Sequence, residues 1–269
     1  MKKFYITLII LNFFTISFLN AKASKPKHDT EAASIKAVEN GLRDTVILGG
    51  EKPSHMNIFD RMKHYGAPAV SIAVIDKGKM AWAKRYGKIK GSPDSKTGDT
   101  LPLFQAASVS KSITAVGALL LVQQGKLSLD KDVNIYLKSW KVPENKFTVG
   151  QKVTLRRLLS HSAGTSVGGF NGYSVDQKIP SLVEILKGEK PLANSEPVSV
   201  IYEPGSKHQY SGGGTTIVQL LIEDVTGEKF DMWMKRNVLD PFGMRESTFS
   251  QSLGSPENQH AVYVERQIY

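Results

Sequence analysis

Apolar residues along this chain follow helical spacing over most of its length and strand spacing in one early region. Residues 31–42 and 58–65 carry apolar side chains three or four positions apart, which predicts two packing helices. Residues 69–75 and 80–86 flank a short polar turn with a glycine, which predicts a β-hairpin. Further helices are predicted at residues 154–159, 179–186, 215–226 and 230–239.

The most apolar segment runs from Val109 to Val122. Its apolar residues cover nearly the whole circumference of a helix, which is typical of a helix buried on all sides, and Gly125 follows as a normal terminating residue. Ser108 precedes this helix, and Lys111 lies one turn further along the same face. Burial and the positive end of the helix dipole both favour an uncharged amine there, able to accept the serine proton. The pattern therefore predicts an activated serine nucleophile.

The Ser-x-x-Lys spacing alone is weak support, because it recurs at Ser24 and Lys27 and at Ser128 and Lys131. Only Ser108 opens an apolar helix, whereas the other two serines lie in polar segments. On this local pattern, the commoner interpretation is a serine that caps a helix beside a lysine reaching toward solvent.

Resemblance to a known family favours the catalytic interpretation. The segment Phe104-Gln105-Ala106-Ala107-Ser108-Val109-Ser110-Lys111 resembles the nucleophile segment of the serine β-lactamase and penicillin-binding-protein superfamily. The branch is that of class C β-lactamases, D-alanyl-D-alanine carboxypeptidases and esterases, and the similarity spans about residues 55 to 250. Other stretches resemble the superfamily in the same order: residues 69–87, Leu158-Leu159-Ser160-His161-Ser162-Ala163-Gly164, Glu203-Pro204-Gly205 with Tyr210-Ser211-Gly212, and Pro241-Phe242-Gly243-Met244.

The resemblance implies an α+β fold of the β-lactamase and transpeptidase type, with an antiparallel sheet flanked by helices and a mainly helical subdomain. It implies that Ser108 is the acylated nucleophile, that Lys111 eases the loss of its proton, and that Tyr210 relays the proton to the leaving group. Ser211 and Gly212 correspond to the substrate-binding positions. A phenol beside an ammonium group has a lowered pKa, which favours Tyr210 as a phenolate base. The backbone N–H of Ser108 would supply one oxyanion donor.

Two departures from the family pattern bear on activity. Gly212 stands where relatives usually carry an asparagine, so the carboxamide that would hold a β-lactam or a peptide amide is missing. This departure favours esters or small D-amino-acid peptides as substrates. Relatives also carry a Lys/His-Thr-Gly element on a strand after the tyrosine. Lys96-Thr97-Gly98 and His64-Tyr65-Gly66 match it in letters, but both precede the serine. We therefore expect a chain truncated at its C-terminus, with the last strands of the sheet missing.

Two other hydrolytic schemes have some sequence support. His161 offers a Ser-His pair, but a histidine at a helix end is more often structural, and the resemblance assigns it no proton transfer. The segment Gly164-Thr165-Ser166-Val167-Gly168 matches the G-x-S-x-G elbow, which requires a strand before it and a helix after it. Here a predicted helix precedes the segment and a glycine-rich stretch follows it. We therefore expect His161 to be structural and Ser166 not to be the nucleophile.

The N-terminus has the pattern of a secretory signal peptide. Two lysines precede an apolar run from Phe4 to Leu19, and Ala21-Lys22-Ala23 provides a small-x-small cleavage site. The apolar run is shorter than the ~20 residues that a membrane-spanning helix needs. We therefore expect cleavage after Ala23, a periplasmic or secreted protein, and no stable membrane span after cleavage.

Composition excludes several classes of function. The chain of 269 residues contains no cysteine, which excludes disulfides, thiolate metal sites and an N-terminal lipid on cysteine. Without the signal peptide it carries 32 basic and 25 acidic residues, a net charge of +7. The lysines are scattered, which favours solubility or attraction to anionic envelope polymers over nucleic-acid binding. No H-E-x-x-H motif appears, and we expect neither a metal ion nor another cofactor.

These observations predict three regions: a signal peptide at residues 1–23, a linker and helix at 24–54, and a β-lactamase-like serine hydrolase domain at 55–269, incomplete at its end. The expected function is hydrolysis of a small amide, ester or β-lactam, or of a cell-wall peptide, through an acyl-enzyme. The alternative is a catalytically inactive truncated relative, or a module that binds cell-wall fragments. A complementing C-terminal polypeptide is a further expected partner.

Overall fold

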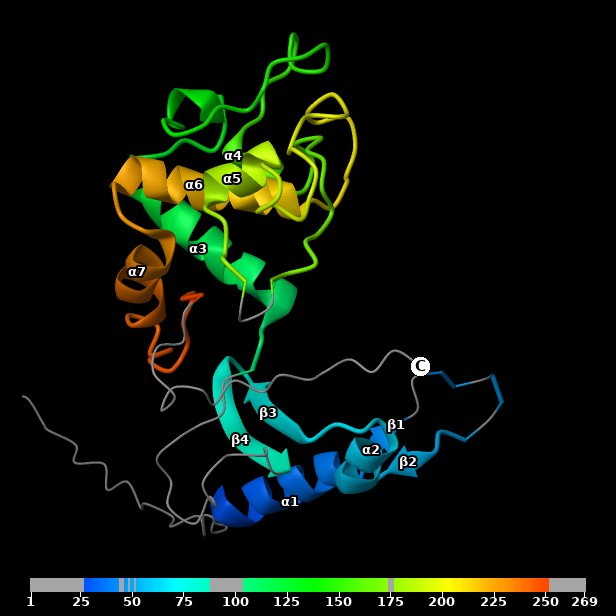
Figure 1. The fold of residues 1–269 in the computed structure, drawn as a ribbon. Coiled ribbons are helices and arrows are strands. Elements are labelled where there is room, and N and C mark those ends of the chain that lie inside the picture. The colour runs from blue at the N-terminus through cyan, green and yellow to red at the C-terminus, as the bar shows by residue number, and fades with distance from the viewer. Residues whose placement is uncertain are drawn as a thin grey trace, which may run out of the picture. The chain divides into compact units, whose positions relative to one another are not determined.

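The structure is a computed structural model that describes residues 27–43, 46–47, 49–50, 52–87, 104–173 and 177–251, with side chains from residue 31 onward. The chain divides into two compact units, residues 1–90 and 91–269 (Figure 1). Each unit has its own cluster of buried apolar residues. The predicted signal peptide and Lys96-Thr97-Gly98 lie outside the described residues.

The first unit is built on a β-hairpin with two helices. Its elements are α1 (Lys27–Glu39), β1 (Leu42–Arg43), β2 (His55–Met56), α2 (Ile58–His64), β3 (Ala69–Asp76) and β4 (Lys79–Gly87). Strands β3 and β4 pair antiparallel, as do β1 and β2. Lys77 and Gly78 both have positive φ, the conformation that a tight hairpin turn with the right twist requires. The predicted hairpin is therefore confirmed.

A small core joins the helices of the first unit to the hairpin. Ile58 and Met62 of α2 pack with Tyr86 of β4, and all three are buried. Helix α1 is held to the same strand by a hydrogen bond from Trp82 Nε1 to Ser34 Oγ at 3.0 Å. The second predicted helix is thus found at α2, whereas α1 lies four residues earlier than its predicted start and ends before Asn40 and Gly41.

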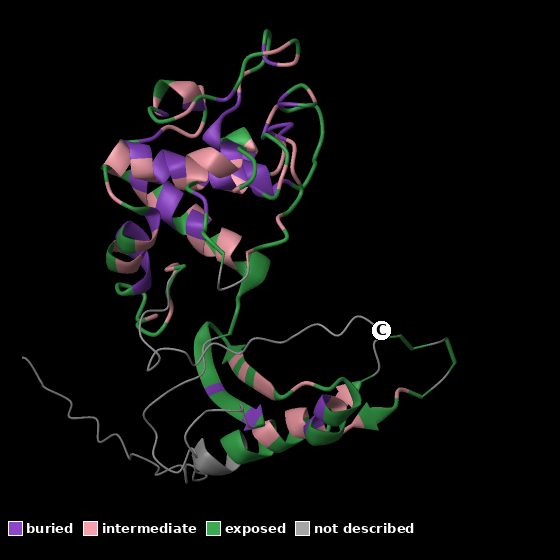
Figure 2. Cartoon of the chain, viewed as in Figure 1, coloured by how far each residue is buried: buried purple, intermediate pink, exposed green. Residues whose placement is uncertain are grey.

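The second unit is mainly helical and is centred on α6 (Gly212–Thr226). The other helices are α3 (Ser110–Gln123), α4 (Leu155–Leu159), α5 (Leu182–Lys187) and α7 (Phe230–Met234), and each of them contacts α6, with α3 crossing it (Figure 1). Short helical turns are η1 (Ala107–Val109), η2 (Val133–Ile135) and η3 (Lys235–Leu239, a π-helical turn). Ten residues of α6 are buried, so it forms the axis of the larger core (Figure 2).

Among the described residues of the second unit, helix α3 is buried along one side, which corrects the prediction of burial all round. The buried side of α3 includes Gly117, Ala118 and Leu121. A methyl group added at Gly117 would lie 2.5 Å from Sδ of Met234 in α7, so α3 and α7 meet closely there. By contrast, Val116 and Leu119 are 38% and 45% exposed. Apolar composition alone does not say on how many sides neighbours pack, and within its own unit α3 has neighbours along one face.

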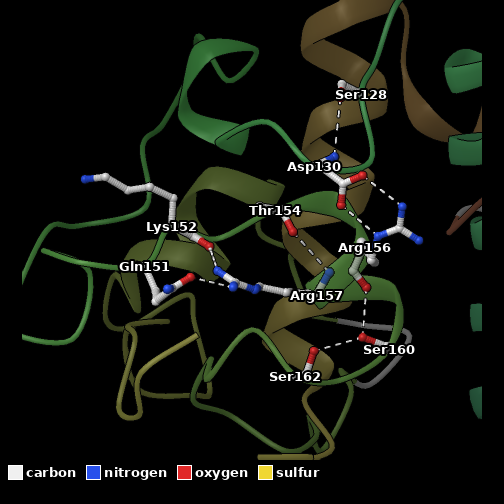
Figure 3. Close-up of polar contacts among 9 residues, drawn as sticks. All are labelled: Ser128, Asp130, Gln151, Lys152, Thr154, Arg156, Arg157, Ser160 and Ser162. Carbon is white, nitrogen blue, oxygen red and sulfur yellow. Dashed lines mark hydrogen bonds and ion pairs between the residues drawn. The ribbon is translucent and has the colours of Figure 1, made fainter. Parts of the chain in front are cut away.

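Helix α4 is short but fixed at its start and on its surface (Figure 3). The Thr154 hydroxyl caps the helix by accepting a hydrogen bond from the Arg157 N–H at 3.3 Å. Asp130 accepts two hydrogen bonds from the Arg156 guanidinium, at 2.7 and 2.8 Å. Because this pair is exposed and screened by solvent, it contributes little to stability. The segment that follows α4 therefore leaves from a defined position.

The remaining predicted helices are found with shifted ends. Helix α5 begins after Ser181, which forms a capping box with Glu184, and ends at Gly188 in the left-handed conformation. Helix α6 begins three residues earlier than predicted because Ser211 caps it and Gly212 to Gly214 adopt helical conformation. Among the described residues, no helix combines the length and apolar character needed to cross a membrane.

Candidate active site

Ser108 and Lys111 lie at the start of α3, on consecutive turns of the same face. Ser108 is in the turn η1, directly after Ala107, and is exposed, while Lys111 is half-buried. Lys111 Nζ donates a hydrogen bond to Ser108 Oγ at 3.2 Å. The predicted meeting of these two side chains is therefore present in the structure, at the surface of the second unit.

Tyr210 joins the pair from 102 residues further along the chain. Its hydroxyl oxygen lies 2.7 Å from Ser108 Oγ, which is hydrogen-bonding distance. Lys111 Nζ lies 5.0 Å from the centroid of the tyrosine ring, within reach of a cation–π interaction. Hydrogen bonding to Lys111 and to Ser108, together with the lysine charge, lowers the pKa of the Tyr210 phenol from its ordinary value of 10.0. The structure thus brings together all three residues predicted to be catalytic.

His161 holds Tyr210 in place from both sides. The carbonyl oxygen of His161 accepts a hydrogen bond from the Gln209 N–H at 2.7 Å, and its Nδ1 accepts one from the Ser211 N–H at 3.3 Å. The two donors are the immediate neighbours of Tyr210 along the chain. The imidazole also packs against the tyrosine ring, with ring centroids 4.5 Å apart. His161 is therefore a positioning residue for Tyr210.

The surroundings of His161 favour the neutral imidazole. Burial, the nearby His208 and the Lys111 charge lower its pKa from the ordinary value of 6.5. Because Nδ1 accepts a hydrogen bond, the proton of the neutral ring is on Nε2. No contact between His161 and Ser108 appears among the described interactions, and the Ser-His scheme has no geometric support here.

Ser211 and Gly212, the predicted substrate-binding residues, lie at the start of α6 beside Tyr210. The Ser211 side chain is 1% exposed, accepts a hydrogen bond from the Gly214 N–H at 2.9 Å and donates to the Ser166 carbonyl at 2.7 Å. Its hydroxyl is thus engaged in capping the helix. Gly212 is also buried, and a methyl group there would lie 3.2 Å from the Gly168 carbonyl oxygen. The neighbouring backbone is therefore close, and it would have to shift by a few tenths of an ångström to admit a side chain at this position.

The G-x-S-x-G segment forms the support under the start of α6. Thr165 bridges Val200 in antiparallel fashion, and the Ser166 hydroxyl accepts a hydrogen bond from the Ser199 N–H at 2.9 Å. The Val167 carbonyl accepts from the Gly213 N–H at 3.0 Å. This is an extended support rather than a strand-turn-helix elbow. The sequence analysis did not predict that this segment supports α6. The signal that could have shown it is the glycines at 168–169 and 212–214, which let the segment and the start of α6 approach closely.

Backbone strain is concentrated around the site. Among the described residues, four that are not glycine have a positive φ, namely Lys77, Ala107, His161 and Val167. Only Lys77 belongs to the hairpin turn, whereas Ala107 precedes the serine and the other two support Tyr210 and the start of α6. Such conformations cost on the order of 1–3 kcal/mol each and persist only where surrounding contacts enforce them.

A serine hydroxyl between an amine and a phenol of lowered pKa is equipped for proton removal and nucleophilic attack. Together with the helical unit and the short antiparallel sheets, this arrangement defines the class of the β-lactamase and penicillin-binding-protein fold. The chain belongs to the Beta-lactamase family, whose model matches residues 56–267. The expected α+β fold of this family is confirmed.

Two named proteins resemble the chain. It is 26% identical over 191 residues to Protein flp of Staphylococcus aureus, covering 69% of this chain and 35% of the relative. It is 29% identical over 167 residues to Penicillin-binding protein 4* of Bacillus subtilis, covering 61% and 34%. The chain thus spans about a third of the length of these two relatives.

Solved structures show the same fold. The octameric penicillin-binding protein homologue of Pyrococcus abyssi superposes with a TM-score of 0.54 at 25% identity, over 72% of this chain and 43% of that one. The D-amino acid amidase of Ochrobactrum anthropi superposes with a TM-score of 0.51 at 25% identity, over 70% and 50%.

Proposed function

We propose that this protein is an exported serine hydrolase that acts through an acyl-enzyme on a small ester, amide or β-lactam. The observation that carries the proposal is the contact of the Ser108 hydroxyl with both Tyr210 and Lys111, at 2.7 and 3.2 Å. Export rests on the predicted signal peptide and would yield a mature chain that begins at Ser24.

The contacts among Ser108, Lys111 and Tyr210 support the following chemistry. The Tyr210 phenolate takes the Ser108 proton, and the serine oxygen forms a bond to the substrate carbonyl carbon. In this scheme Lys111 is charged, rather than the uncharged proton acceptor expected from the sequence, and its charge stabilises the phenolate. Tyr210 then gives the proton to the leaving alcohol or amine as its bond to the carbonyl carbon breaks. In the second half of the reaction, Tyr210 takes a proton from water, the water oxygen forms a bond to the acyl carbon, and the serine oxygen leaves and receives the proton from Tyr210. In both halves the Ser108 N–H, at the first helical turn, donates a hydrogen bond to the oxyanion.

The substrate class rests on Gly212 and on one of the relatives. The absence of a carboxamide side chain at Gly212 removes the group that would hold a β-lactam or peptide amide, which favours esters over both. One structural relative is a D-amino acid amidase, solved with L-phenylalanine amide. We therefore place small activated esters and D-amino-acid amides first among the substrates.

The test is active-site labelling of the full chain with a fluorescent fluorophosphonate, read by gel and by mass spectrometry. We expect one label, on Ser108, and none in Ser108→Ala, whose melting temperature stays close to that of the parent because Ser108 is exposed. Ser128→Ala is the matched control, since Ser128 has the same spacing to a lysine but lies in a turn. Folded parent protein without label on Ser108 would contradict the proposal.

The second candidate is a non-catalytic relative that binds anionic cell-wall fragments through its net positive charge of +7. It predicts no acylation but binding of muropeptides that weakens as salt rises, because the attraction is screened. Calorimetry at two ionic strengths separates the two candidates. Acylation of Ser108 at either ionic strength excludes this one.

A further inference from the structure

The chain contains the dipeptide Asn-Gly twice, at Asn40-Gly41 and at Asn171-Gly172. An asparagine before a glycine is chemically labile, because the backbone nitrogen of the glycine can attack the side-chain carbonyl carbon of the asparagine. Glycine has no Cβ to obstruct this approach. The attack requires a carboxamide that can rotate and a backbone N–H that is not engaged elsewhere. The fold therefore decides which of the two sites reacts.

The fold restrains the reacting groups of Asn40 and Gly41. The Asn40 carboxamide donates a hydrogen bond to the Lys36 carbonyl at 2.9 Å, and its oxygen accepts one from the Asn57 carboxamide at 2.8 Å. The Gly41 N–H donates to the Val38 carbonyl at 3.3 Å. These three hydrogen bonds must open before the nitrogen can attack, so this site is protected in the folded chain.

Asn171 and Gly172 lie in a loop without such restraints. Both residues are exposed, and neither belongs to a helix or a strand. Among the described residues, none is hydrogen-bonded to the Asn171 carboxamide, and none accepts a hydrogen bond from the Gly172 N–H. The Gly172 carbonyl, which takes no part in the attack, accepts a hydrogen bond from the Asn194 carboxamide at 2.5 Å. The two labile groups can therefore meet while the protein stays folded.

We propose that Asn171 is a site of spontaneous modification, at which the asparagine becomes a mixture of aspartate and isoaspartate. The Gly172 nitrogen loses its proton and bonds to the Asn171 side-chain carbonyl carbon, and the side-chain nitrogen leaves as ammonia. Water then adds to either carbonyl carbon of the resulting cyclic imide and breaks the bond from that carbon to the Gly172 nitrogen, which takes back a proton. Opening at the side-chain carbon gives aspartate, and opening at the main-chain carbon gives isoaspartate. The net reaction consumes water and releases ammonia.

The modification changes the loop that carries it. Asn171 and Glu196 both line a cavity of about 450 Å³ between residues 166–171 and 194–199. A carboxylate at position 171 gives this lining two acidic side chains in place of one. Isoaspartate also lengthens the main chain by one carbon directly before Gly172, whose carbonyl is hydrogen-bonded to Asn194. Negative charge therefore accumulates at this loop as the protein ages, and Ser108 takes no part in the reaction.

The experiment incubates the full chain in mildly alkaline buffer, which favours loss of the amide proton, and follows two tryptic peptides by mass spectrometry. The peptides are residues 37–43 and 158–178, each of which contains one Asn-Gly pair and no other asparagine. We expect Asn171 to lose its amide at least ~10-fold faster than Asn40 in the folded chain, because Asn40 reacts only after its hydrogen bonds open. In denaturing urea the two sites should react at similar rates. Equal rates in the folded chain would overturn the proposal.

Variants of the exposed Asn171 identify the product, and substitutions there should leave the fold intact. Asn171→Gln keeps a carboxamide but lengthens the side chain by one methylene, which disfavours ring closure, and we expect no acidic form to accumulate. Fresh Asn171→Asp should elute from an ion-exchange column with the acidic form of the aged parent. Labelling by protein isoaspartyl methyltransferase should place isoaspartate in the peptide 158–178.

Ser108→Ala is the control for the proposed hydrolase activity. Its Asn171 should lose the amide at the same rate as the parent, because the attacking atom is the Gly172 nitrogen. An acidic form that still appears in Asn171→Gln, or a rate that depends on Ser108, would overturn the proposal. Both results leave the acylation of Ser108 untouched, so the two proposals stand or fall separately.

Discussion

The Nδ1 atom of His161 accepts a hydrogen bond from the backbone N–H of Ser211 at 3.3 Å, across 50 residues of sequence. This bond joins the end of α4 to the start of α6, and Tyr210 lies next to it. Because the acceptor must be an unprotonated nitrogen, the bond exists only while the imidazole is neutral. The position of the proposed proton relay therefore depends on the protonation state of His161.

The first prediction concerns acid stability. The pKa of His161 is lower in the folded chain than its ordinary value of 6.5. As the pH falls below about 6.5, this imidazole therefore binds a proton more readily in the unfolded chain than in the folded chain. Stability contributed by the neutral ring is complete above pH 6.5 and is lost as pH falls through the folded pKa. We expect His161→Asn to show a shallower loss of unfolding free energy between pH 7 and 5 in urea titrations, by at most ~1.4 kcal/mol per pH unit.

Asparagine is the informative replacement because it tolerates the positive φ of 54° at this position and keeps an acceptor oxygen. His161→Ala loses both advantages. We expect His161→Ala to destabilise the protein at neutral pH by ~1–3 kcal/mol and to lower the acylation rate, with His161→Asn restoring most of both. Equal pH slopes for the parent and His161→Asn would show that another group causes the acid sensitivity.

The second prediction concerns the phenol. Lys111 is the leading cause of the lowered pKa of Tyr210, so Lys111→Met should return this pKa toward 10.0. The measurement is the absorbance of tyrosinate near 295 nm during an alkaline titration, with Tyr210→Phe subtracted to isolate the residue. The acylation rate should also fall, by ~10²–10⁴-fold, the usual contribution of a positioned proton acceptor. A Tyr210 titration unaltered by Lys111→Met would refute the coupling.

The third prediction separates folding from binding at Ser211. Ser211→Ala removes the cap of α6 and leaves the Gly214 N–H without its acceptor in a buried place, so we expect a loss of ~1–3 kcal/mol in unfolding free energy. Ser181→Ala, which removes the exposed cap of α5, should cost ~0.5–1 kcal/mol. A raised KM in fully folded Ser211→Ala would assign the hydroxyl to the substrate as well, as the family resemblance implies.

The fourth prediction concerns Asp224, which fastens α6 to the loop before residue 140. Its carboxylate is 7% exposed and accepts hydrogen bonds from the Lys138 N–H at 2.6 Å, the Ser139 N–H at 3.1 Å and the Ser139 hydroxyl. Asp224→Ala leaves these donors without a partner, and we expect a loss of ~3–5 kcal/mol. Asp130→Ala breaks an exposed ion pair and should lower the unfolding free energy much less than Asp224→Ala does. Similar losses in the two variants would contradict the assignment.

The sequence was sufficient for the parts that depend on local spacing. Ser108 and Lys111 meet because residues three apart share a helix face, and the hairpin around Lys77 and Gly78 follows from its turn residues. Tyr210 is different. Nothing in the local pattern brings it to Ser108 across 102 residues, and only the family resemblance indicated the contact that the structure contains.

Tertiary packing explains the remaining differences. The apolar sequence of α3 predicted burial on all sides, but burial depends on where neighbours lie, and Leu119 remains 45% exposed. His161 accepts hydrogen bonds from the residues on either side of Tyr210, and it does so with a left-handed backbone conformation. Sequence spacing cannot reveal that conformation.

The left-handed conformations of Ala107, His161 and Val167 have an evolutionary consequence. Glycine would adopt these angles freely, so a lineage selected for thermal robustness alone has an easy substitution at Ala107 and at Val167, whereas glycine at His161 would also remove the acceptor of the Ser211 N–H. Glycine at Ala107 or Val167 would also widen the range of positions open to the serine and to the start of α6. Variants that gain resistance to heat through Ala107 or Val167 should therefore become slower and less selective together.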